Sequence, residues 1–149
     1  MMENFWSALS AKLLTDATLV GLVGDVRTGT KDIRIGRSLP VKQAKYPYLA
    51  FSAGNDEAMI PDAFTGFKST IVRFDCIAKD ELTSIKIGDR IETLLHRSGV
   101  AQNVQYFNIS NSVVMNNWTL FLTRSHATFN DETDAWTTEI MANFKWHLK

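Results

Sequence analysis

The sequence has one cysteine, Cys76, and no excess of charge of either sign. A lone cysteine forms no disulfide within the chain and is too few for a structural zinc site, which is built from several Cys or His ligands. Lys and Arg total 16, as do Asp and Glu, so the formal net charge is zero. Dedicated DNA- and RNA-binding domains usually carry a basic excess, so this composition argues against that class of protein.

Long apolar runs are also missing. No segment reaches the roughly 18 consecutive apolar residues of a membrane-spanning helix. The first residues, Met1–Phe5, contain no basic stretch followed by an apolar one, so they do not resemble a signal peptide. From these two absences we expect an intracellular protein with no membrane partner.

Motifs of catalytic and metal sites are absent as well. The histidines His96, His126 and His147 show no HxH or HExxH spacing, and we interpret them as solvated or capping side chains. Cys76 falls on the apolar face of an alternating segment, which is typical of a buried free thiol. We therefore assign no catalytic residue, no metal ligand and no cofactor, and we expect a protein that is not an enzyme.

The sequence does contain enough apolar material for a core. Hydrophobic residues make up 45% of the chain and charged residues 21%, which is typical of a globular protein and not of a disordered one. At about 150 residues per domain, the length predicts a single domain over residues 1–149. A chain of this size buries roughly 70% of its unfolded surface, so it needs no disulfide or metal to fold.

Two segments have the spacing of amphipathic helices. The first runs from Asn4, a candidate N-cap, to Val23, just before Gly24. The second opens after Asp80, whose side chain is suited to cap a helix. Gly88 costs this helix about 1 kcal/mol of propensity relative to alanine, so we expect it to permit a close approach to a sheet. The predicted buried stripe of the second helix comprises Leu82, Ile85, Gly88, Ile91, Leu94 and Leu95.

Alternating polar and apolar residues predict the strands. The firmest alternation covers residues 136–148, and the polar turn Asn130–Glu132 would join this strand to an earlier one as a long hairpin. Pro47 cannot donate a ladder hydrogen bond, so we expect it at the first residues of its strand or on a sheet edge. The other predicted strands cover residues 32–36, 46–51, 70–78, 103–109 and 113–123.

The predicted order of elements is α-β-β-β-α-β-β-β. This order indicates an α+β fold with a mostly antiparallel sheet, two helices packed on one face and a long C-terminal hairpin. No internal repeat or linker divides the chain, in agreement with a single domain.

Two segments are candidate contact surfaces. The connection over residues 52–69 is much longer than the roughly 2–5 residues of an ordinary hairpin loop. Its apolar side chains are not needed for solubility; they either contact a partner or fold back on their own domain. The second segment is the tip of the C-terminal hairpin. We predict contacts with neighbouring subunits or partners through Met59, Ile60, Phe64, Phe67, Phe129, Asn130 and Asp131.

Several short segments, taken in order, are similar to one protein family. Leu19–Gly24 ends the first helix, Ile33–Gly36 forms a short strand and Tyr46–Leu49 begins the next. A strand ending in Phe74–Ala78, a helix that carries Gly88 and a long terminal hairpin follow. Over nearly the whole chain, this arrangement resembles the tail-completion, or tail-terminator, proteins of long-tailed phages.

The resemblance implies a virion structural protein without catalytic residues. Members of that family form a ring, usually a hexamer, at the head-proximal end of the tail tube. The ring ends tube growth and provides the joint to the head, and phage DNA passes through its lumen without specific binding. For this chain, the resemblance implies a ring of identical subunits that is assembled in the host cytoplasm. Its implied partners are a tail-tube protein and a head-completion or connector protein.

Two other interpretations stay open. Another phage head–tail connector or minor tail protein could have the same plan. A small α+β ligand-binding protein or enzyme would instead have a pocket between the sheet and the helices, lined by His126 or Cys76 and opening through a polar mouth.

Overall fold

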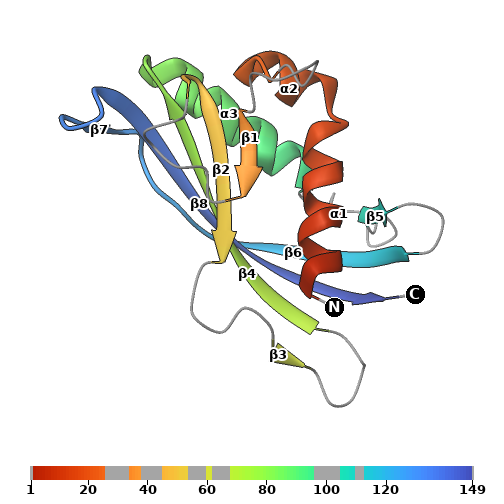
Figure 1. Cartoon of the computed structure of the whole chain (residues 1–149). Coiled ribbons are helices and arrows are strands. Elements are labelled where there is room, and N and C mark those ends of the chain that lie inside the picture. Colours follow the sequence, from red (N-terminus) through yellow and green to blue (C-terminus); the bar gives the residue numbers. More distant parts are fainter. Residues whose placement is uncertain are drawn as a thin grey trace.

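The structure, a computed structural model, describes residues 2–25, 34–37, 45–53, 60–61, 68–95, 105–109 and 113–148. Within these ranges, helices and one mixed sheet form an α+β fold, which confirms the predicted class (Figure 1). The helices are α1 (Met2–Leu14), α2 (Ala17–Val23) and α3 (Glu81–Leu95). The strands are β1 (Ile35–Arg37), β2 (Tyr48–Ala53), β3 (Ile60–Pro61), β4 (Lys68–Ala78), β5 (Gln105–Ile109), β6 (Val113–Arg124), β7 (Thr128–Asn130) and β8 (Ala135–Leu148).

The main path of the sheet is β1-β2-β4-β8-β6-β5, with β3 paired to β4 and β7 paired to β8. Of the described pairs, β1 and β2 run parallel and the others run antiparallel. Pro47 directly precedes β2, as its missing N–H predicts. The predicted terminal hairpin is confirmed: β6 and then β7 pair with β8, and a bulge interrupts β6 between Phe121 and Thr123.

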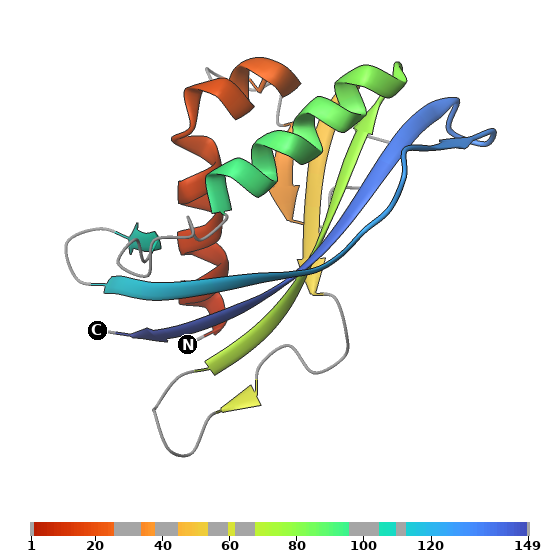
Figure 2. The ribbon, with the colours of Figure 1, turned by 180° about the vertical axis from the view of Figure 1, so that it is seen from behind.

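All three helices contribute to one core on one face of the sheet. α3 packs against β4 and β8, and Figure 2 shows it running diagonally over this face of the sheet. α1 lies close to both edge strands, β1 and β5, because the sheet curls around this helix. Phe5 of α1 meets Phe144 of β8 edge to face, with ring centroids 5.6 Å apart. The fully buried side chains of this core include Leu9, Leu13, Leu19, Ile35, Leu49, Val72, Phe74, Cys76, Ile87, Ile91, Ile140 and Ala142.

The first helical segment is two helices and not the single helix that the spacing predicts. Thr15 and Asp16 break it, and the Asp16 carboxylate accepts a hydrogen bond of 2.9 Å from the backbone N–H of Leu19. Asp16 is therefore the N-cap of α2. The predicted end is confirmed, because Gly24 caps α2 in the left-handed conformation at φ 70°. The predicted start is wrong, because α1 begins at Met2 and Asn4 lies inside it.

The buried stripe of α3 differs from the predicted one at its start. Leu82 is 59% exposed, whereas Ser84 and Ile87 are buried. The Ser84 hydroxyl lies 2.9 Å from the Cys76 carbonyl oxygen and 2.7 Å from the Thr138 hydroxyl, so a hydrogen-bonded polar pair is buried beneath the first turns of the helix. Ile85 and Leu94 of the predicted stripe are only partly buried. The predicted cap and the predicted close approach are confirmed: Asp80 accepts from the Thr83 N–H at 2.8 Å, and Gly88 is packed closely. Among the described residues, no helix is long and apolar enough to cross a membrane.

Candidate functional site

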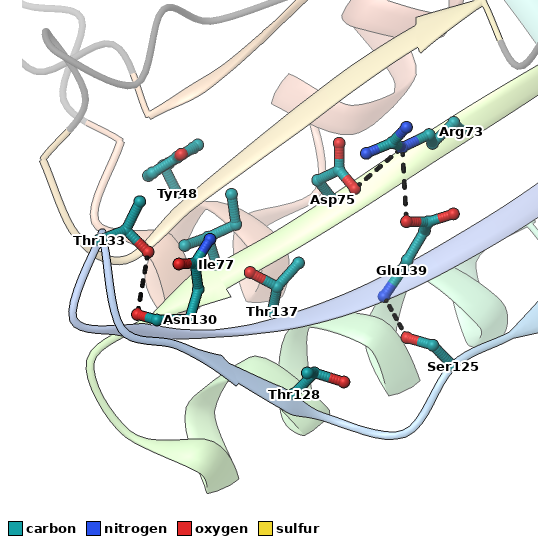
Figure 3. Close-up of a pocket in the computed structure, with 10 residues that line it drawn as sticks. All are labelled: Tyr48, Arg73, Asp75, Ile77, Ser125, Thr128, Asn130, Thr133, Thr137 and Glu139. Atoms are coloured by element: carbon teal, nitrogen blue, oxygen red, sulfur yellow. Dashed lines mark hydrogen bonds and ion pairs between the residues drawn. The ribbon is translucent and has the colours of Figure 1, made fainter.

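A pocket of about 470 Å³ lies on the face of the sheet opposite the helices. Its floor is formed by outward-facing residues of β2, β4 and β8, and its wall by the chain that runs from the end of β6 through β7 to the turn before β8 (Figure 3). Strand alternation explains this placement, since the neighbours of these residues in sequence point into the core. The lining residues are Tyr48, Arg73, Asp75, Ile77, Ser125, Thr128, Asn130, Thr133, Thr137 and Glu139.

Three charged side chains lie together on the floor of the pocket. The Nε of Arg73 lies 3.2 Å from a carboxylate oxygen of Asp75 and 3.6 Å from one of Glu139. Asp75 and Glu139 are register partners on β4 and β8, so the sheet itself holds the two carboxylates side by side. Asp75 is the less accessible of the two, with 19% of its side chain exposed against 39% for Glu139.

Burial changes the acidity of two groups on the floor. It raises the pKa of the Asp75 carboxyl, an effect that Arg73 opposes and Glu139 adds to. Burial, together with the nearby Tyr46 and Asp75, raises the pKa of Tyr48 to about 12. The Tyr48 phenol is therefore neutral at physiological pH and can donate a hydrogen bond.

Hydrogen bonds to the rest of the domain fix the wall of the pocket. The Ser125 hydroxyl accepts from the Glu139 N–H at 2.9 Å, and the Ser125 N–H donates to the Glu139 carbonyl oxygen at 2.8 Å. At the other end, Lys79 donates to the Asp134 carbonyl oxygen at 3.0 Å and lies 4.7 Å from the centre of the Tyr46 ring. The wall is therefore attached at both ends.

The structure brings together the three predicted contact residues of the hairpin tip. Phe129 is 41% exposed and meets Trp136 edge to face, with ring centroids 5.4 Å apart. Asn130 and Asp131 are exposed beside it, and the Asn130 side chain accepts a hydrogen bond of 2.9 Å from the Glu132 N–H. The sequence prediction placed this tip at a contact surface; the structure shows that it is accessible.

The predicted contact residues of the 52–69 connection are described only in part. Met59, Phe64 and Phe67 lie outside the described residues, and Ile60 is described only as part of the backbone of β3, where it pairs with Ser69. This short strand interrupts the connection that the sequence predicted as a continuous loop. The two predicted surfaces are therefore not placed relative to each other.

The residues considered for catalysis do not line the pocket. Cys76 is buried in the core, and burial raises the pKa of its thiol well above the ordinary value. His126 is exposed, and neither residue lines the pocket. Within the described ranges, no three His, Cys, Asp or Glu side chains are grouped to hold a metal ion. His96 lies outside the described residues, and His147 is described only in its backbone.

The pocket itself was not predicted from the sequence. Its charged residues are Arg73 and Asp75 on β4 and Glu139 on β8, and only the pairing register brings the two strands together. The one available signal was that Arg73 and Asp75 both point away from the apolar face of their strand. This alternation predicts which side chains face away from the core, but it does not predict a pocket there.

Comparison with solved structures shows a likeness in fold to chains of known structure. A chain of a solved structure titled "Virion of native gene transfer agent (GTA) particle" superposes with a TM-score of 0.62. The likeness covers 95% of this chain and 92% of that chain at 16% sequence identity. No protein-family model matches the chain, and no curated protein matches it significantly.

Proposed function

We propose that this chain is a structural protein of a phage-like virion, and that it forms a ring at the head-proximal end of the tail tube. The observation that carries the proposal is the likeness in fold to a chain of a virion structure, which extends over nearly the full length of both chains. The order of short segments that resembles tail-terminator proteins supports the same role. In this role the ring ends tube growth and joins the tail to the head, and its subunits have no catalytic task.

Ring formation requires two different surfaces on each subunit, because a closed ring uses head-to-tail contacts. The domain offers several surfaces on different sides. The tip around Phe129 projects from one end of the sheet, the edge strands β1 and β5 lie at its two sides, and the face with the pocket is opposite the helices. These surfaces are suited to heterologous contacts.

The solution mass of the purified protein tests this proposal. Light scattering after size exclusion would be measured with and without tail-tube protein from the same genome. A mass about six times the 16.8 kDa monomer, with closed rings in electron micrographs, would support a self-assembling ring. A monomer that joins tube ends only when tube is present would support a terminator that assembles on its template.

Two other results would contradict the tail role. A protein that stays monomeric and does not bind the tail tube would exclude the function of a tail terminator. A protein that binds a purified head connector but not the tail tube would place it elsewhere in the virion, as another head–tail connector.

A further inference from the structure

The charges that line the outer-face pocket do not balance. Among the described residues, its lining contains two carboxylates, Asp75 and Glu139, and one cation, Arg73. Both carboxylates contact the same nitrogen of that cation, Nε, at 3.2 and 3.6 Å. Each carboxylate can accept up to about four hydrogen bonds. The shared contact with Arg73 Nε therefore uses only a small part of the hydrogen bonds that the two carboxylates can accept.

The remainder of the lining consists mainly of groups that can accept hydrogen bonds. Hydroxyl or amide oxygens come from the floor and from the wall, in the residues Ser125, Thr128, Asn130, Thr133 and Thr137. A planar cation with several N–H donors and no acceptor matches such a lining, because it can pair with carboxylate and hydroxyl oxygens at once. An anion would meet a net negative charge.

We propose that this pocket binds a guanidinium group at the end of an arginine side chain from another protein molecule. The volume of about 470 Å³ accommodates the head group and part of its stem, and is far larger than a bare metal ion needs. Asp75 and Glu139 provide the counter-charges, and the attached wall formed by Ser125 and Thr133 limits the approach to the open side. The proposal does not depend on the virion role, since the pocket is a property of the folded domain.

A small probe tests the chemistry directly. The full-length protein would be titrated with methylguanidinium chloride and followed by backbone amide NMR, with sodium chloride at equal ionic strength and neutral methylurea as matched controls. We expect saturable shifts at the amides of residues around the pocket, such as Thr137 and Glu139, and no comparable shifts with either control. Equal shifts with sodium chloride or methylurea would overturn the proposal.

Two variants separate specific binding from a disturbed fold. Glu139→Gln and Asp75→Asn each remove one counter-charge, and either should weaken methylguanidinium binding about tenfold, as expected for the loss of one charge-assisted hydrogen bond. Glu81→Gln removes the same charge from the first turn of α3, outside the residues that line the pocket, and should leave binding unchanged. Unchanged binding in both pocket variants, with native-like spectra, would overturn the proposal.

A separate experiment identifies the protein that provides the arginine. Sedimentation velocity over a range of protein concentrations would compare the unaltered chain with Glu139→Gln. Weaker self-association in that variant, but not in Glu81→Gln, would identify a second copy of this chain as the donor. If methylguanidinium binds and self-association is unchanged, the arginine belongs to a different protein. The NMR titration does not depend on ring formation. A negative result for the ring proposal can therefore be distinguished from a negative result for guanidinium binding.

Discussion

Arg90 of α3 holds both carboxylate oxygens of Asp16, the residue that caps α2. Its Nε donates to Oδ2 at 2.8 Å and its Nη2 to Oδ1 at 2.6 Å, while Oδ2 also accepts from the Leu19 N–H. The Asp16 carboxylate thus caps the N-terminus of α2 and also links α2 to α3. The hydrogen bonds from Arg90 lower the pKa of Asp16 below its ordinary value of 3.8.

This pair predicts a pH-dependent loss of stability in Arg90→Ala. Because the folded-state pKa of Asp16 is depressed, the contribution is fully present above pH 3.8 and is lost as the pH falls through the lowered folded-state pKa. At pH 7 we expect a loss of about 1.5–3 kcal/mol in the free energy of unfolding, the range of a hydrogen bond to a charged group. Urea denaturation at pH 7 and near pH 2 measures it, and an equal loss at both pH values would contradict the assignment.

Gly88 and Arg124 predict a non-additive pair of substitutions. A Cβ at position 88 would lie 3.1 Å from Nη2 of Arg124 and 3.3 Å from Cγ2 of Thr138. The Arg124 guanidinium crosses the helix there and reaches Asp89 at 2.8 Å and Glu92 at 3.0 Å. In Gly88→Ala, the gain of about 1 kcal/mol in helix propensity should be cancelled by displacement of this guanidinium.

The same substitution made in an Arg124→Ala background should be less harmful or stabilising. A double-mutant cycle by thermal unfolding should give a coupling of roughly 0.5 kcal/mol or more between the two positions. Additive effects would show that the contact with Arg124 does not limit position 88.

The buried hydroxyl pair of Ser84 and Thr138 predicts a second non-additive effect, which a double-mutant cycle can measure. Since a hydroxyl has one hydrogen, Ser84 donates to the Cys76 carbonyl and Thr138 donates to Ser84. Ser84→Ala leaves the Thr138 hydroxyl without this acceptor in the core and should cost about 1–3 kcal/mol of unfolding free energy. Adding Thr138→Val removes the stranded donor, so the double variant should be more stable than the sum of the two single losses predicts. Chemical denaturation of the four proteins measures this difference.

Sequence periodicity predicted the elements in which apolar residues recur at regular spacing and face the core. The alternation along residues 136–148 predicted β8, because every second side chain from Thr138 to Phe144 is buried. The break at Asp16 was missed because the step from Leu13 to Ala17 keeps the helical period across it, although Asp16 is a good capping residue in its own right. Leu82 was misplaced because its spacing fits the stripe, whereas the buried position belongs to Ser84.

The candidate site was less predictable for a different reason. Exposed positions such as Phe129 and Asp131 can be recognised from a turn in the sequence. The pocket depends on which residue of β4 lies opposite which residue of β8, and on the course of the chain after the bulge in β6. Neither the register nor the bulge leaves a local sequence signal, so Asp75 and Glu139 could not be brought together from the sequence alone.

The connection between β2 and β4 predicts an assembly defect without a folding defect. Replacing residues 56–67 by a short Gly/Ser linker removes β3, which adds only two register pairs to β4, whereas β8 pairs with β4 along its full length. We expect cooperative thermal unfolding to persist while ring formation or binding to tube ends is lost. Normal assembly of this variant would show that Met59, Phe64 and Phe67 do not form a contact surface.

Phe129 provides the sharper test of the hairpin tip, because the chain offers a matched control. Phe129 and Leu82 are the two large apolar side chains that are exposed among the described residues, at 41% and 59%. Phe129→Ala loses one edge-to-face contact with Trp136, worth about 0.5–1.5 kcal/mol, so the domain should remain folded. If the tip contacts a neighbour, this variant should lower the assembled mass in light scattering at a concentration where the unaltered chain is assembled, and Leu82→Ala should not. Equal effects of the two variants would indicate a general loss of surface hydrophobicity, and no effect of Phe129→Ala would remove the tip from the interface.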